Sequence, residues 1–164
     1  MVSFFRKKSG VTNLEWLGAD IHSSLLPGFN EGAPALQDAV AYIKELSEKG
    51  IEEIYFTPLV PNHSYQESGA IISSAKDNLD KALQAAGIAM RLMTGAKYLI
   101  DGQFSITNEL ITLPRKHILL ELSPLKETRN LEEIIFDLQI RGYKVILARP
   151  EFYSYYHEHL SRYK

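Results

Sequence analysis

The sequence contains no cysteine among its 164 residues. Disulfide bonds, thiolate zinc sites and cysteine nucleophiles are therefore excluded. Long apolar runs are also missing, because stretches such as Ile118–Leu120 and Val145–Ala148 are far shorter than the roughly 20 residues of a membrane helix. The net charge is −2, from 18 basic and 20 acidic residues, without the basic surplus of a general nucleic-acid binder. We expect neither a membrane span nor a nucleic-acid partner.

Several well-known motifs are missing as well. The basic cluster Arg6–Lys8 has no apolar segment behind it, so the start is not a signal peptide and a cytoplasmic location is expected. The chain has no Walker-type phosphate loop, dinucleotide fingerprint or Gly-x-Ser-x-Gly elbow. Its apolar content of 45% suits one compact domain with a proper core. We expect residues 1–14 to be a flexible N-terminal segment and residues 15–164 to form a single domain.

Short β-rich runs alternate with longer amphipathic ones along the chain. The pattern predicts strands at Leu17–His22, Glu53–Thr57, Ala89–Leu99, His117–Glu121 and Lys144–Ala148. It predicts helices from about Pro34 to Gly50, over Ile71–Ala86 and over Leu131–Ile140, a polar loop at Pro58–Ser68, and fraying of the first ten residues and of Glu151–Lys164. This alternation is typical of an α/β fold with mostly parallel strands, whose chemistry lies at the carboxyl ends of the strands.

Polar residues near those strand ends are the candidates for a site: His22, Glu31, Thr57, His63, Tyr98, Glu121, Arg149 and Glu151. The spacing of His157 and His159 puts them on different faces of a helix, so we expect a solvated surface pair rather than metal ligands. His22 ends a strand next to Asp20 and just before a turn. From the residues alone, a core or capping role and a site role for His22 stay equally open.

Five stretches of the chain resemble one known family in the same order: ADIHSSLLPGFNEGAPALQDAV, YFTPLVPNHSY, MTGAKYLID, HILLELS and NLEEIIFDLQIRGYKVILARPEFY. The first resembles the usual family opening DIHSHLLPGIDDGA, and the last, which matches without a gap, is the most specific. On these motifs the chain is identified as a member of the PHP-type bacterial tyrosine-protein phosphatases of capsule and exopolysaccharide loci. The resemblance covers the chain from Trp16 to Tyr156.

The resemblance implies a distorted β/α barrel with a cluster of divalent metals, usually manganese, at its carboxyl end. Histidines and carboxylates would hold the metals, which activate water and bind phosphate oxygens. A complete β/α barrel takes about 250 residues. We therefore expect residues 15–164 to form a partial or distorted PHP-like barrel with about five of the strands, whose unpaired edges favour self-association.

Carried over position by position, only two metal-binding positions of the family keep their residue type, as His22 and Glu121. Ser24, Leu59 and Arg149 stand where the family has histidine, Asn30 (beside Glu31) where it has aspartate, Lys97 where it has glutamate, and Phe152 where it has a phosphate-binding arginine. Leucine has no lone pair, and a lysine or arginine puts positive charge where a dication should bind. His22 and Glu121 are therefore expected to be vestigial metal positions, and no cofactor is expected.

The two introduced cations allow two interpretations. Lys97 and Arg149 can pair with Asp20 and Glu121 and so replace the lost dications electrostatically, or both can point into solvent. In the first case the same pair of cations can also hold a phosphate or another anion.

Three functions from different classes remain open. The first is a catalytically inactive homologue that acts as a binding or regulatory scaffold linked to polysaccharide synthesis, with a tyrosine kinase or its phosphotyrosine tail as partner. The second is an active phosphatase, dependent on manganese or another divalent metal, that hydrolyses phosphotyrosine of a capsule-locus kinase. The third is a decayed or truncated product without a selected role.

Overall fold

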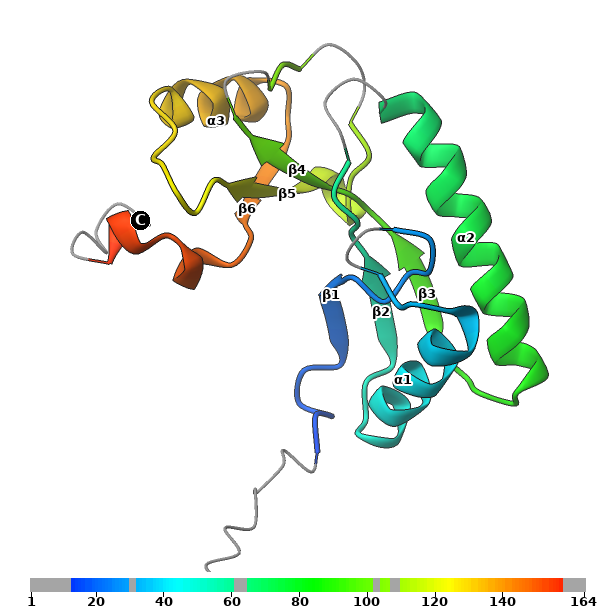
Figure 1. Cartoon of the computed structure of the whole chain (residues 1–164). Coiled ribbons are helices and arrows are strands. Elements are labelled where there is room, and N and C mark those ends of the chain that lie inside the picture. The colour runs from blue at the N-terminus through cyan, green and yellow to red at the C-terminus, as the bar shows by residue number, and fades with distance from the viewer. Residues whose placement is uncertain (1–12, 30–31, 61–64, 102–103, 107–109, 158–164) are drawn as a thin grey trace, which may run out of the picture.

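The computed structural model describes residues 13–29, 32–60, 65–101, 104–106 and 110–157 (Figure 1). Its strands and helices, in chain order, are β1 Ala19–Ser23, α1 Leu36–Glu48, β2 Glu53–Phe56, α2 Tyr65–Ala85, β3 Arg91–Thr94, β4 Lys97–Ile100, β5 His117–Leu122, α3 Leu131–Ile140 and β6 Lys144–Leu147. Short 3-10 helices lie at Pro114–Lys116, Pro150–Phe152 and Ser154–Tyr156.

The strands form two three-stranded sheets, in the orders β1-β2-β3 and β4-β5-β6. The neighbours in each sheet run parallel, which confirms the predicted α/β class. A single parallel bridge between Leu59 and Lys97 joins the end of β2 to the start of β4. The two sheets therefore continue into one curved wall.

The predicted third strand, Ala89–Leu99, is bent rather than straight, and its two halves are β3 and β4. β3 pairs with β2, whereas β4 pairs with β5. At the bend the N–H of Gly95 donates to the carbonyl of Phe56 at 2.8 Å, and a Cβ atom on Gly95 would lie only 2.8 Å from Leu113 Cδ2. Glycine thus permits a close approach that a side chain would obstruct, and the wall turns there.

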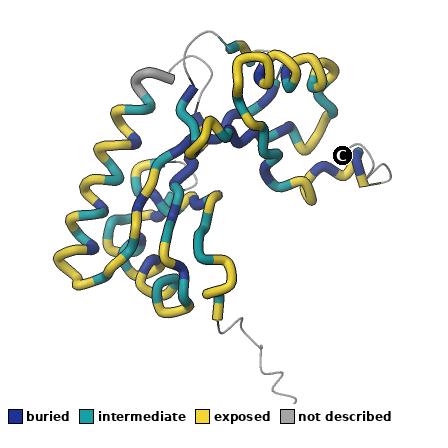
Figure 2. The backbone as a smooth tube through the Cα atoms, turned by 180° about the vertical axis from the view of Figure 1, so that it is seen from behind, coloured by how far each residue is buried: buried dark blue, intermediate teal, exposed yellow. Residues whose placement is uncertain are grey.

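The helices cover the outer face of this wall. α1 and α2 pack against the sheet of β1–β3, and α3 packs beside β6 (Figure 1). Ile54 and Phe56 alternate with half-buried residues along β2 and are fully buried. On α2, Leu79 and Leu83 are one turn apart and equally buried, while exposed residues lie along the outward faces of the helices (Figure 2).

Two predicted boundaries are wrong. The first strand begins at Ala19 rather than Leu17, because Gly18 has a φ of 68° that interrupts extended backbone. The loop expected at Pro58–Ser68 is too long, since α2 already begins at Tyr65. The sequence of the first turn of α2 has few apolar residues at helical spacing, so the hydrophobic pattern does not predict that this turn is helical.

The predicted fraying of Glu151–Lys164 is wrong for the part that the structure describes, which ends at His157. Tyr153 and Tyr156 are only 1% and 4% exposed and belong to the main core. Burying two aromatic rings outweighs the polar character that made this stretch resemble a loose tail. The fraying predicted for the first ten residues lies outside the described residues.

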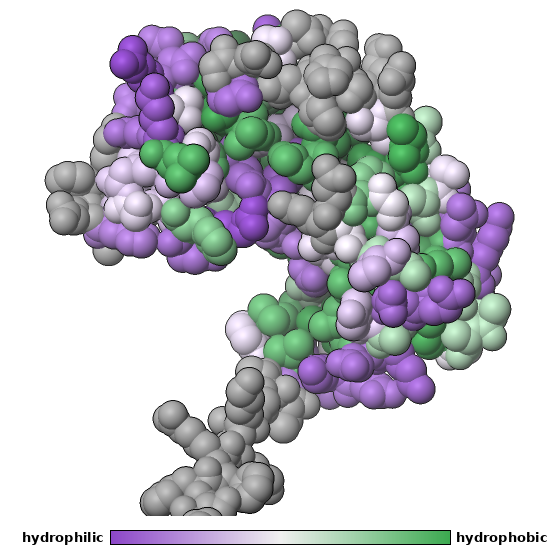
Figure 3. Space-filling view, viewed as in Figure 1, coloured by the Kyte–Doolittle hydropathy of each residue, from purple (hydrophilic) through white to green (hydrophobic). Residues whose placement is uncertain are grey.

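β1 and β6 are the outermost strands of the wall, and within the described ranges each pairs on one side only. The strands therefore do not close into a barrel, and a partial barrel stays a prediction. Figure 3 shows the surface hollowed between the part that holds β1 and the part that holds the last 3-10 helices. None of the helices described is both long and apolar enough to cross a membrane.

Candidate functional site

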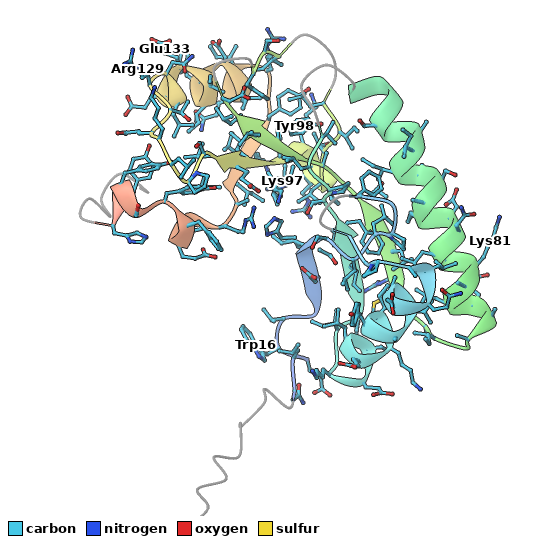
Figure 4. All side chains as sticks on the ribbon, in the orientation of Figure 1. Trp16, Lys81, Lys97, Tyr98, Arg129 and Glu133 are labelled. Atoms are coloured by element: carbon cyan, nitrogen blue, oxygen red, sulfur yellow. The ribbon has the colours of Figure 1, made fainter. Side chains whose placement is uncertain are left out.

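Four predicted site residues come from separate strands and converge at the hollow side of the wall. Lys97 begins β4, Glu121 lies in β5, Arg149 follows β6 and His22 lies in β1. Side chains alternate along β4, so Lys97 and Tyr98 leave the strand on opposite sides (Figure 4). Glu121 is paired in register with Leu99, which places Lys97 and Glu121 on the same face.

The carboxylate of Glu121 is bracketed by the two cations. Lys97 Nζ lies 2.6 Å from Glu121 Oε2, and Arg149 Nη2 donates to Glu121 Oε1 at 2.5 Å. The exposed fractions of the side chains are 2% for Lys97, 15% for Glu121 and 32% for Arg149. The pairing with Glu121 that the sequence left as one of two interpretations is therefore present, and Lys97 does not point into solvent.

The backbone of Arg149 is unusual. Its φ of 49° and ψ of 54° lie in the left-handed region, which costs a non-glycine residue about 1–2 kcal/mol. This conformation turns the chain sharply between β6 and Pro150 and directs the guanidinium toward Glu121 on the neighbouring strand. The guanidinium carbon also lies 5.1 Å from the ring centre of Phe152, a cation–π distance.

Tyr153 is a site residue that sequence reasoning missed. Its hydroxyl accepts a hydrogen bond from the N–H of Leu122 at 3.0 Å and donates to the carbonyl of Ala148 at 2.7 Å. Leu122 follows Glu121, and Ala148 precedes Arg149. The tyrosine therefore ties together the two backbone segments that carry this ion pair. The sequence feature that could have identified Tyr153 is its place at the end of the motif ARPEFY, but the predicted fraying tail Glu151–Lys164 includes it.

The charges around the site shift two pKa values. Burial alone would raise the pKa of Glu121, but hydrogen bonds from Arg149 and Lys97, together with their charges, lower it below its ordinary value. Burial is the main cause that lowers the pKa of His22, and the positive charges of Lys97 and Arg149 lower it further. The negative charges of Asp20 and Glu121 raise it, but by less. At neutral pH the site thus holds an ionised carboxylate and an uncharged imidazole.

The other predicted candidates are placed less centrally. Asp20 accepts a hydrogen bond from the backbone N–H of His22 at 3.0 Å. Tyr98 belongs to the opposite face, where its hydroxyl bonds both backbone groups of Ile111. Glu151 is exposed beside His157, whose ring contacts the Glu151 carbonyl. Three further candidates lie outside the described residues: Asn30, Glu31 and His63.

Thr57 lies at the carboxyl end of β2 and is 1% exposed. Its hydroxyl has no hydrogen-bond partner within the part of the chain that the structure describes. A buried hydroxyl normally has a partner, and leaving one unmet costs about 1–3 kcal/mol. Thr57 therefore offers one polar group near the site that a ligand or water molecule can satisfy.

A divalent metal does not fit the arrangement of Lys97, Glu121 and Arg149. Both carboxylate oxygens of Glu121 already contact cationic groups, so a metal would have to displace them and then be repelled by both. Among the described residues, no three His, Cys, Asp or Glu side chains are grouped as metal ligands. No metal-dependent step follows from this geometry.

Comparison with known proteins gives one consistent result. A profile of the family described as capsular polysaccharide synthesis, CpsB/CapC, matches residues 18–164. The tyrosine-protein phosphatase YwqE of Bacillus subtilis (strain 168) is 30% identical over 136 residues, which cover 80% of this chain and 54% of that protein. The putative tyrosine-protein phosphatase CapC of Staphylococcus aureus is 21% identical over 136 residues, with coverage of 80% and 53%.

A solved structure gives the same picture. It belongs to a set of crystal structures of YwqE from Bacillus subtilis and CpsB from Streptococcus pneumoniae, and these two proteins are described as unique metal-dependent tyrosine phosphatases. It aligns with this chain with a TM-score of 0.74 at 27% identity. The alignment covers 88% of this chain and 60% of the other. This chain thus spans about half the length of the curated relatives it matches.

Proposed function

The chain belongs to the CpsB/CapC family of capsular polysaccharide synthesis proteins, whose members are tyrosine phosphatase-like, and we propose that it is a catalytically inactive homologue that binds a phosphorylated partner. The partner of this proposal is a tyrosine kinase or its phosphotyrosine tail, in the cytoplasm. Residues 15–164 are proposed to form a single incomplete barrel that carries this binding site.

One observation carries the proposal: Glu121 contacts Lys97 and Arg149 at the position where the family resemblance implies metal ligands. A lysine and an arginine supply positive charge that does not depend on metal. They can offset the charge of a phosphate, but they generate no metal-bound hydroxide to attack it. Phosphate binding without hydrolysis is the activity that this exchange supports.

The altered positions also contact one another. Phe152 stacks against Arg149, and Leu59 forms the backbone bridge to Lys97. Positions that hold one metal cluster lie close together whatever residues occupy them, so their proximity alone does not separate reuse from decay. What favours a reused site is that two of the replacements are cations and that both compensate the retained Glu121.

The proposed ligand position lies on the exposed side of Arg149, whose side chain is 32% exposed. Arginine presents five N–H donors in a planar fork that suits phosphate oxygens. The uncharged His22 adds a hydrogen-bonding group without adding charge.

Isothermal titration calorimetry with a phosphotyrosine peptide and its unphosphorylated control tests this proposal. We expect binding of the phosphorylated peptide that is unchanged by a chelator and weakened at least tenfold by Arg149→Ala, because a charge-assisted phosphate contact is worth about 1.5–3 kcal/mol. Arg91→Ala is the matched control, since Arg91 also pairs with a carboxylate at 2.5 Å but lies elsewhere on the surface.

The competing function is an active, manganese-dependent phosphatase, which the 30% identity to YwqE favours. It is tested by adding manganese to the same peptide and measuring released phosphate, together with the metal content of the purified protein. We expect no release above buffer and well under one equivalent of metal. Turnover that requires manganese and is lost in Glu121→Gln would overturn the proposal.

A further inference from the structure

Four exposed cations gather at the amino ends of β5 and β6. Two lie in the turn before β5, one follows α3 and one begins β6: Arg115, Lys116, Arg141 and Lys144. His117 and Lys144 are paired in register across the two strands. Lys116 Nζ also lies 5.7 Å from the centre of the Tyr143 ring, so the turn before β5 is beside the turn before β6. We call these four residues the basic edge.

The charges of the basic edge are not neutralised within the part of the chain that the structure describes. No carboxylate there forms an ion pair with any of the four side chains. The whole chain has a net charge of −2, so the basic edge is a local excess of positive charge. Such a patch attracts an anionic partner.

The turn that holds the first two cations has a strained backbone. Arg115 and Lys116 have φ angles of 58° and 59°, so two consecutive non-glycine residues are left-handed. This conformation is unfavourable for a residue with a Cβ atom, and strain of this kind is concentrated at functional sites. Here it leaves both side chains exposed, with Lys116 Nζ 3.9 Å from the position of a Cβ atom on Gly142. A turn that only connected two segments would not need this strain.

The chemistry beside the basic edge indicates which anionic partner fits. Ile140 directly precedes Arg141 and is 69% exposed, on a helix that lies on the outside of the wall (Figure 1). Anionic lipid head groups attract lysine and arginine, and the boundary between head groups and acyl chains accepts an apolar side chain beside them. A soluble acidic peptide would attract the same cations but would offer Ile140 no apolar phase.

We propose that the basic edge docks on the surface of a membrane that contains anionic lipids, with Ile140 entering the head-group region. The amino ends of β5 and β6 then face the bilayer. Glu121 lies four residues beyond His117 along β5, which is about 13 Å further from the lipid. The Lys97–Glu121–Arg149 site therefore stays open to solvent while the chain is docked. This proposal does not depend on the proposed phosphate binding.

Flotation of the full chain with lipid vesicles measures the docking. We expect binding to phosphatidylcholine vesicles that contain about one third phosphatidylglycerol, and no binding to pure phosphatidylcholine. Each lysine or arginine near an anionic surface strengthens binding roughly fivefold, so Arg141→Gln/Lys144→Gln should weaken it roughly 25-fold. The matched control is Lys49→Gln/Lys81→Gln, which removes two exposed lysines near α1 and on α2 and should change binding by less than about twofold.

A second substitution separates a bilayer from an acidic protein as the partner. Ile140→Gln keeps every charge, and it should still weaken vesicle binding at least about threefold, because the apolar contact with the bilayer is lost. Soluble polyglutamate serves as the protein-like probe. Vesicle binding that is unchanged in Ile140→Gln, or tighter binding of polyglutamate than of vesicles, would indicate an acidic protein partner and overturn the proposal.

The other basic cluster of the sequence, Arg6–Lys8, lies outside the described residues and needs its own control. Arg6→Gln/Lys7→Gln/Lys8→Gln should keep most of the vesicle binding and the full effect of Arg141→Gln/Lys144→Gln. Binding that is lost in the triple variant but unaffected by the double variant would assign the docking to the N-terminal segment. That result, or a chain that does not bind anionic vesicles at all, would overturn the proposal.

Discussion

Lys97 Nζ lies 2.6 Å from Glu121 Oε2, across the neighbouring parallel strands β4 and β5. The lysine is 2% exposed and therefore has almost no water to hydrate its charge. A buried charge of this kind persists only when a partner compensates it. The carboxylate that the family would use to hold metal thus stabilises a cation that belongs to the chain itself.

Replacing this lysine tests whether the pair stabilises the fold. Lys97→Met keeps the length and apolar stem of the side chain but leaves Glu121 with Arg149 alone. Breaking a buried pair commonly costs about 3–5 kcal/mol, and because Arg149 still compensates Glu121, we expect about 2–3 kcal/mol. Urea unfolding followed by circular dichroism measures the change.

The control is Lys44→Met, which removes a lysine from the exposed pair with Glu48 at 3.9 Å and should change stability by less than about 0.5 kcal/mol. The double variant Lys97→Met/Glu121→Leu should be less destabilised than the sum of the single variants by at least about 1 kcal/mol, because neither charge is left alone. Additive single effects would show that the two residues do not stabilise each other.

Two substitutions at Arg149 separate the effect of its charge on stability from the effect of its left-handed backbone conformation. Arg149→Ala removes the ion pair but keeps a side chain at a φ of 49°, so we expect a loss of about 1–3 kcal/mol. Arg149→Gly removes the same ion pair and relieves the left-handed strain, so it should be about 1 kcal/mol more stable than Arg149→Ala. Equal losses from both, or a loss no greater than that of the exposed control Arg91→Ala, would contradict this account.

The lowered pKa values predict that acid destabilises the protein in two steps. His22 has a pKa below its ordinary 6.5, so the unfolded chain takes up its proton first and stability falls as pH drops below about 6.5. Glu121 has a pKa below its ordinary 4.5, so its contribution is present above that value and is lost as pH falls through the folded value.

Urea unfolding at intervals from about pH 8 to about pH 2 should show both steps, because the Glu121 contribution is lost only well below its ordinary pKa of 4.5. The difference between wild type and His22→Gln isolates the upper step, because all other groups titrate alike in both proteins. Glu121→Gln should flatten the lower step, and it should enlarge the upper step, because the charge of Glu121 raises the pKa of His22. Stability that increases as pH falls from about 6.5 would mean that folding raises the pKa of His22, the opposite of the direction found here.

Sequence patterns predicted most of the fold because they report local properties. The helix Leu131–Ile140 was predicted with the bounds it has, since its apolar residues recur at helical spacing. The bend that divides β3 from β4 was not predicted. It depends on the approach of Leu113 to Gly95, two residues far apart in the sequence, and a single sequence carries no signal of that contact.

The site was predicted in part for the same reason. Residue patterns located Glu121 and Arg149 near strand ends, which parallel strands bring to one edge. Lys97 was singled out only by the family resemblance, because the pattern placed it inside a predicted strand. Whether the two cations pair or face solvent stayed open, because it depends on strand register and on the left-handed backbone of Arg149. Tyr153 was missed because its role depends on two backbone groups, the N–H at the end of β5 and the carbonyl just after β6.

Tyr153 provides the last test, since its hydroxyl joins the backbones next to Glu121 and Arg149. Tyr153→Phe keeps the buried ring but leaves a buried N–H and a buried carbonyl without this partner, so we expect a loss of about 1–3 kcal/mol. Tyr155→Phe, which removes one bond to the Ser123 carbonyl, should cost less. If Tyr153 positions the ion pair, Arg149→Ala should cost less in the Tyr153→Phe background than in wild type. Strict additivity of the two substitutions would instead make Tyr153 a core residue without influence on the site.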